Sequence, residues 1–96
     1  MRDIKYSLAF EVTYIDEAGD TVYSEIRERE VEITGFVRSH QNTEWTFTQI
    51  RNNISNESGS PKTLERIAST LTATRAKKVP VRAIVSLVSH CVIPKS

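Results

Sequence analysis

The N-terminal stretch alternates apolar and polar residues without a break, and this pattern limits the fold more than any other feature of the chain. Six apolar side chains stand two residues apart, at Ile4, Tyr6, Leu8, Phe10, Val12 and Tyr14. A period of two is typical of a β-strand with one buried face. Residues 16–20 then supply turn-forming residues, with Gly19 able to adopt a positive φ. The pattern predicts a hairpin whose first strand covers residues 4–14.

The second strand of this hairpin contains a conflict in its alternation. Val22, Ser24 and Ile26 share one parity, whereas Val31 and Ile33 have the other. The sequence therefore predicts a bulge or a break within the charged segment 27–30. Such charges at a sheet edge discourage aggregation with other sheets, and the same segment is also a candidate contact surface.

The segment after the hairpin fits two kinds of secondary structure. Residues 43–50 alternate as a strand would, yet Phe47, Ile50 and Ile54 also have the spacing of one helical stripe. A helix over 43–55 leaves only a short connection at residues 56–60, whereas a strand would leave a long stretch without structure. We therefore expect a helix.

A second helix and a final strand are expected in the C-terminal half. Ser60 is a good N-cap and Pro61 suits the first helical position, so this helix should run from there to about residue 77. Pro80 stops it and leads into a strand at residues 81–93. Alternation within that strand places Cys91 with Leu87 and predicts an inert, packed thiol. Apolar residues on both sides of this strand indicate that both of its faces are covered.

These elements predict an α+β fold, a small antiparallel β-sheet packed on one face by two helices, in the order β-β-α-α-β with the first strand central. The length of 96 residues suits a single domain over residues 1–96. A homodimer with twofold symmetry would cover the second sheet face; the alternative is a scattered apolar surface exposed to solvent. The candidate residues of that face are Ala9, Ile15, Ile84, Val88 and Val92.

Composition and charge restrict the functional classes. One cysteine excludes an internal disulfide, and no run of apolar residues reaches the 18 of a membrane span, so we expect a cytoplasmic protein with no membrane partner. Residues 1–35 carry four cations and nine anions, whereas residues 36–96 carry nine cations and three anions. The chain therefore has an acidic and a basic half, either of which could face a charged partner.

The sequence offers few groups for chemistry. Two histidines, His40 and His90, and the single Cys91 do not make a metal site, and strand neighbours such as His90 and Cys91 point to opposite faces. The glycines at 19, 35 and 59 do not form a phosphate-binding loop. We therefore predict a protein that is not an enzyme, with no catalytic residues, no metal and no cofactor.

Binding to another protein is the first functional interpretation, as a small regulator or inhibitor of the kind that phages and other mobile elements encode as viral accessory proteins. A short chain without catalytic groups can act by covering about 800 Å² of a partner's surface. The candidate contacts are the charged segment and nearby aromatic anchors, namely Tyr23, Glu25, Arg27, Glu28, Arg29, Glu30 and Trp45.

Nucleic-acid binding by the basic half is the alternative. Residues 60–67 follow a short connection between two helices, and this stretch is similar to the recognition helix of helix-turn-helix proteins. The resemblance implies that Lys62, Thr63 and Arg66 face the groove, although Gly59 and Glu65 depart from the pattern. The cations that would contact nucleic acid are Lys62, Arg66, Arg75, Lys77, Lys78 and Arg82.

Overall fold

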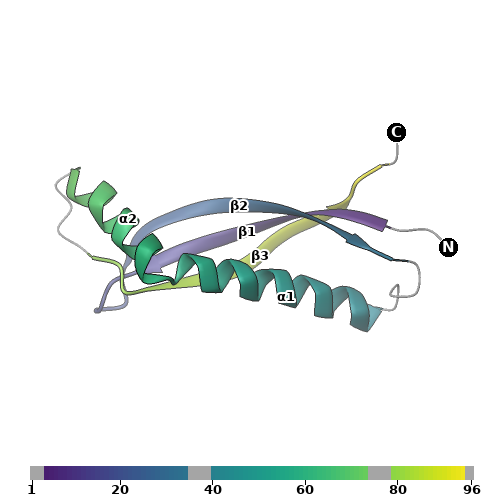
Figure 1. Cartoon of the computed structure of the whole chain (residues 1–96), viewed down its shortest axis with the longest axis horizontal. Helices are drawn as coiled ribbons and strands as arrows, with labels where there is room; N and C mark the ends of the chain where they lie inside the picture. The colour runs from purple at the N-terminus through teal and green to yellow at the C-terminus, as the bar shows by residue number, and fades with distance from the viewer. Residues whose placement is uncertain (1–3, 35–39, 74–78, 95–96) are drawn as a thin grey trace.

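A computed structural model describes residues 4–34, 40–73 and 79–94. The chain forms strands β1 (Ile4–Ile15) and β2 (Thr21–Ile33), helices α1 (His40–Ser58) and α2 (Pro61–Ala73), and strand β3 (Arg82–Val92). Helix α1 runs along the three-stranded sheet, and α2 sits at one end of it (Figure 1). The predicted α+β fold and its order β-β-α-α-β are confirmed.

The sheet has the order β2-β1-β3, with β1 antiparallel to both neighbours, so the expected central position of the first strand is confirmed. The loop between β1 and β2 is closed by Asp16, whose carboxylate accepts hydrogen bonds from the backbone N–H groups of Ala18 and Asp20 at 3.0 and 2.9 Å. Gly19 has a φ of 88°, the left-handed conformation for which glycine is suited.

The core lies between α1 and the alternating apolar face of β1. Leu8, Phe10, Val12 and Tyr14 are fully buried there, which confirms the alternation read from the sequence. Helices α1 and α2 contribute Phe47, Ile54, Ile67 and Leu71 to the same cluster. Burial of these side chains supplies the main favourable free energy of folding, because it scales with the apolar area removed from water.

Strand β2 runs unbroken through residues 27–30, so the predicted bulge there is wrong. Arg27 and Arg29 lie opposite Phe10 and Leu8 and therefore face the side that the helices cover. Glu28 and Glu30 face the other side. The conflict in parity arises because two long basic side chains, and not apolar ones, occupy inward positions in the middle of the strand.

One irregularity lies at the start of β2, where Tyr14 pairs with Tyr23 and Ile15 with Thr21, so that Val22 is an extra residue. A second lies in β3. Leu87 pairs with Phe10 and Ser89 with Ala9, which leaves Val88 as an extra residue. One inserted residue reverses the parity of everything that follows it. His90 therefore joins Val85 and Leu87 on the helix-covered side.

The reversed parity corrects two expectations for the last strand, and one residue of β1 also differs from what was expected. Cys91 is exposed rather than packed, and it pairs with Ser7 on the side away from the helices. Val92 pairs with Tyr6 and so belongs to the helix-covered side. Ile15, expected on the second face, is buried.

Both helices form where the sequence predicted helices, and α1 is longer than expected. The ambiguous residues 43–50 are helical, and α1 extends from His40 to Ser58, beyond the expected 43–55. At the start of α2 the hydroxyl of Ser60 accepts a hydrogen bond from the N–H of Thr63 at 3.3 Å, which confirms the predicted N-cap. The expected end of this helix near residue 77 lies outside the described residues, which stop at Ala73.

Candidate functional site

The sheet face directed away from α1 is the surface that the described helices leave accessible, and we call it the open face. Strand pairing places its residues in rows across the three strands. The rows are Ser24, Thr13 and Ile84; Ile26, Glu11 and Ser86; Glu28, Ala9 and Ser89; and Glu30, Ser7 and Cys91, with Val88 inserted in β3. Every β2 and β3 residue in these rows is exposed.

The open face is predominantly acidic. Glu28, Glu30 and Glu32 follow one another at every second position of β2, and Glu11 lies beside them on β1. The cations on this face are Lys5 and Arg82 by the same register, and Lys5 lies 3.2 Å from the carboxylate of Glu30. A row of like charges projects a negative potential and favours a partner with basic groups.

Apolar side chains accompany these charges. Ile26 and Ile84 are 57% and 49% exposed, and both lie on the open face; Val88, the extra residue of β3, is 53% exposed. Exposed apolar residues surrounded by polar ones are typical of protein-interaction sites. Glu11, Ile26 and Glu32 were not among the residues singled out from the sequence. Ile26 and Glu32 share their parity with Glu28 and Glu30 and could have been identified once β2 was known to be regular there. Glu11 lies on β1, and only the strand register places it beside Ile26.

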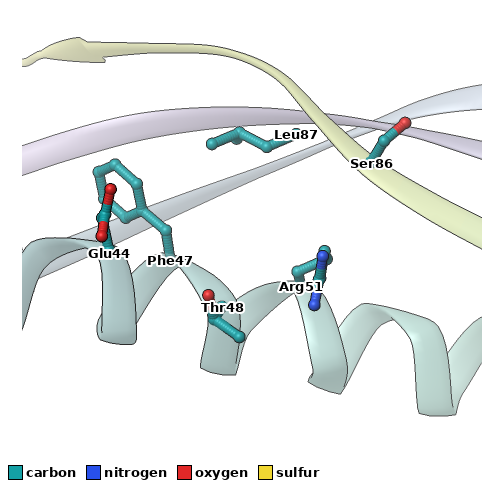
Figure 2. Close-up of a pocket in the computed structure, with 6 residues that line it drawn as sticks. All are labelled: Glu44, Phe47, Thr48, Arg51, Ser86 and Leu87. Atoms are coloured by element: carbon teal, nitrogen blue, oxygen red, sulfur yellow. The ribbon is translucent and has the colours of Figure 1, made fainter.

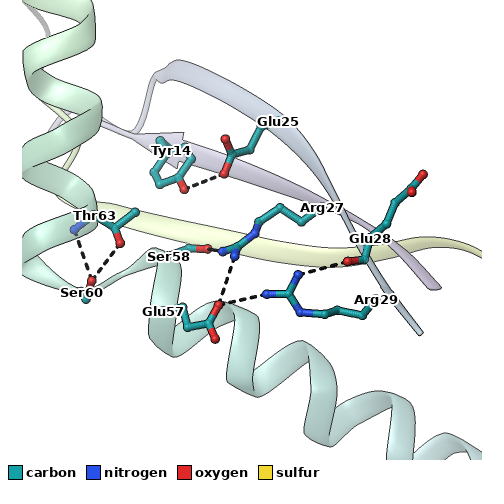
Figure 3. A network of polar contacts seen from close by, with 9 residues as sticks. All are labelled: Tyr14, Glu25, Arg27, Glu28, Arg29, Glu57, Ser58, Ser60 and Thr63. Carbon is teal, nitrogen blue, oxygen red and sulfur yellow. Dashed lines mark hydrogen bonds and ion pairs between the residues drawn. The ribbon is translucent and has the colours of Figure 1, made fainter. Parts of the chain in front are cut away.

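The other charged residues expected at the contact surface lie on the opposite side, in a polar cluster at the end of α1 (Figure 3). Arg27 donates hydrogen bonds to Ser58 at 3.3 Å and to Glu57 at 3.1 Å. Arg29 reaches the same Glu57 oxygen at 3.1 Å. These bonds join β2 to the C-terminal end of α1, so the two arginines attach the helix to the sheet.

Tyr14 and Glu25 complete the polar cluster. The buried Tyr14 hydroxyl donates a hydrogen bond to the Glu25 carboxylate at 3.1 Å. Burial raises the pKa of Tyr14 above its ordinary 10.0, and the negative charge of Glu25 adds to this increase. The candidate contact residue Tyr23 is half-buried, with its ring centroid 5.8 Å from that of Tyr14.

Replacing Tyr14 with phenylalanine should lower the free energy of unfolding by about 1 kcal/mol near neutral pH, through loss of the bond to Glu25. The raised pKa means that the folded state holds the phenolic proton more tightly than the unfolded chain. This contribution to stability is complete below about pH 10 and is lost as the pH rises further. Urea unfolding between about pH 8 and 11 should therefore show a smaller alkaline loss for Tyr14→Phe than for the wild type.

Tyr23→Phe is the matched control for this measurement, because it removes a phenolic hydroxyl from the neighbouring ring and leaves the Tyr14 bond in place. The assignment would be contradicted by Tyr14→Phe and wild-type curves that fall in parallel at alkaline pH.

The remaining predicted protein-binding residue, Trp45, lies on α1 and is 63% exposed. A groove of about 360 Å³ lies between α1 and β3 (Figure 2), and Trp45 is not among the residues that line it. The groove is lined by Glu44, Phe47, Thr48, Arg51, Ser86 and Leu87. Trp45 is therefore separate from the open face and belongs to the exposed side of α1.

The structure brings together only part of the candidate basic surface. Lys62 and Arg66 are exposed one turn apart on α2, and Arg82 is exposed at the start of β3. Residues 75, 77 and 78, the other predicted nucleic-acid contacts, lie outside the described residues.

The two reactive side chains of β3, His90 and Cys91, lie on opposite sides of the sheet. The ring of His90 packs against those of Phe47 and Tyr6, with centroid separations of 5.1 and 6.3 Å. Cys91 lies on the open face. Within the described residues, no three histidine, cysteine or acidic side chains are grouped so that they could hold a metal ion. In that same part of the chain, no helix has the length and apolar character needed to cross a membrane.

Comparison with protein-family models finds no match to this chain. Comparisons with curated proteins and with solved structures also find no match.

Proposed function

We propose that this chain is a non-enzymatic binding protein that regulates or inhibits another protein through its open face. The observation that carries the proposal is the combination, on one side of the sheet, of an acidic row with exposed aliphatic side chains. The row consists of Glu28, Glu30 and Glu32, and the aliphatic residues are Ile26 and Ile84. Apolar contacts supply binding energy, and charges supply orientation and the rate of encounter.

The expected partner carries lysine or arginine residues around an apolar patch. Glu28 and Glu30 point away from the core, so a partner can reach them without unfolding the domain. Arg27 and Arg29, by contrast, are held against Glu57 and contribute to the interface only by fixing the shape of β2. Glu25, bonded to Tyr14, has the same supporting role.

A charge-reversed double variant, Glu28→Lys with Glu30→Lys, tests this proposal. Immobilised wild-type chain would capture proteins from a lysate of the encoding organism, and each captured protein would then be purified and titrated against both chains. Two reversed charges at the interface should weaken the affinity by about a hundredfold or more. The free energy of unfolding should change by less than about 1 kcal/mol, because the Lys5–Glu30 pair is solvent-exposed.

The control is Glu17→Lys with Asp20→Lys, which makes the same change in net charge at exposed loop positions between β1 and β2. It should bind as the wild type does. Two results would refute the proposal. One is that the wild type and the Glu28→Lys, Glu30→Lys variant (the open-face variant) bind every captured protein with equal affinity. The other is that the wild type retains no protein more strongly than this variant does.

Nucleic-acid binding remains the second candidate, favoured by the exposure of Lys62 and Arg66 on one side of α2. It predicts retardation of DNA or RNA in a gel, with a steep loss at increasing salt. The variant Lys62→Glu with Arg66→Glu should abolish that retardation, whereas the open-face variant should not. Retardation with this pattern would assign the function to α2 in place of the open face.

A further inference from the structure

The two edges of the sheet differ sharply in charge. The edge strand β2 has charged side chains at six of its thirteen positions, Glu25, Arg27, Glu28, Arg29, Glu30 and Glu32. From Ala83 to Val92 the other edge strand, β3, has no aspartate, glutamate, lysine or arginine, and no proline or glycine. Charged edges resist pairing with further strands, and long uncharged edges favour it. The segment Ala83–Leu87, which precedes the inserted Val88, is therefore suited to antiparallel pairing with another strand.

Charges on the adjacent helix indicate what that strand belongs to. Glu44 and Arg51 line the groove beside Ser86 and Leu87, and Thr48 lies between them along α1 (Figure 2). A twofold axis perpendicular to the sheet and passing near Ser86 would place two α1 helices antiparallel. Arg51 of each copy would then lie beside Glu44 of the other. The same axis places no like charges of β3 opposite one another, since Ala83 to Val92 carry none of the four charged residue types named above.

We propose that the chain forms a homodimer by antiparallel pairing of two β3 strands, with Glu44 of one copy contacting Arg51 of the other. The result is a continuous six-stranded sheet whose groove between α1 and β3 is closed by the second copy. This pairing leaves the open face accessible, so it adds an interface to the proposed binding function and does not depend on it.

Mass measurement by light scattering and sedimentation over a range of concentrations tests the dimer. The wild type should reach twice the 10.9 kDa of one chain. Arg51→Glu should raise the dimer dissociation constant by about tenfold or more, because each dimer then holds two pairs of facing glutamates. The double variant Glu44→Arg with Arg51→Glu should restore dimerisation, since the exchanged charges again attract.

A second variant tests the strand pairing. Ser86→Lys places a lysine opposite its own copy near the axis and should produce monomers. Its control, Ser24→Lys, makes the same change on the open-face side of the β2 edge and should leave the dimer intact. Circular dichroism should show that both variants are folded.

Three results would overturn the dimer: a wild type that stays at the mass of one chain at every concentration, a dimer unaffected by both Arg51→Glu and Ser86→Lys, or a dimer abolished by Ile26→Lys but not by Ser86→Lys. The last result would place the contact on the open face instead.

Discussion

Replacing Phe10 with alanine is expected to lower the free energy of unfolding by about 3–5 kcal/mol. Phe10 is fully buried on the central strand, between Arg27 of β2 and Leu87 of β3. Removal of its ring leaves a cavity beside both edge strands. Neither strand can move to fill this cavity without losing its register with β1. Because small domains have only about 5–15 kcal/mol of stability, this loss is a large part of the total. Urea unfolding followed by circular dichroism would measure it.

Ile26→Ala is the matched control, because Ile26 is an aliphatic residue of the same sheet that is mostly exposed on the open face. The change there should be within about 0.5 kcal/mol. If the two variants were equally stable, the core would not lie on the face of β1 that contains Phe10.

Ile54→Ala is expected to have the next largest effect, a loss of about 2–5 kcal/mol. Ile54 is 1% exposed and belongs to the turns of α1 that pack against the sheet. The helix is otherwise strongly polar, so its attachment depends on a few apolar side chains and on the bonds of Glu57 and Ser58 to Arg27. Thermal and urea unfolding should both show the loss.

The neighbouring Asn53 provides the control for Ile54, because its side chain is exposed on the same helix turn. Asn53→Ala should be neutral or slightly stabilising, since alanine has the higher helix propensity. A cost for Asn53→Ala as large as that for Ile54→Ala would mean that α1 packs through a different face.

The sequence was sufficient to predict a strand or helix wherever one periodicity extended over the whole element. The alternation from Ile4 to Tyr14 predicted β1 and its buried face, and Ser60 with Pro61 located the start of α2. In α1 the helical spacing of Phe47 and Ile54 outweighed the strand-like residues, because both side chains contact the same sheet.

Prediction from the sequence failed at two places. In β3 an inserted residue reversed the parity of the strand, and in β2 a long charged side chain occupied an inward position. Val88 is aliphatic, like the residues that alternate normally before it, so no local signal marks it as the extra residue that turns His90 inward and Cys91 outward. Arg27 was expected to face solvent because it is charged. Its inward position depends on Glu57, thirty residues away, which no pattern within β2 can reveal.

The same errors in strand parity also limited how much of the candidate site could be predicted. Glu28 and Glu30 were identified because they belong to the charged segment, and their exposure agrees with the proposed contact role. Ile26 was missed because the supposed break in β2 separated it from those glutamates, and Glu11 was missed because only the register of β1 with β2 places it beside Ile26. The open face becomes visible only when all three strands are placed in register.

The position of β1 between strands from the beginning and the end of the chain has a kinetic consequence. Tyr6 is paired with Val92, so half of the hydrogen-bonding capacity of the central strand stays unfilled until the last strand arrives. The β1–β2 hairpin can close early, since its ends are near in sequence, whereas docking of β3 requires closure of a much longer loop. Folding on the ribosome would therefore finish late, with a temporarily unpaired strand edge that the completed domain conceals.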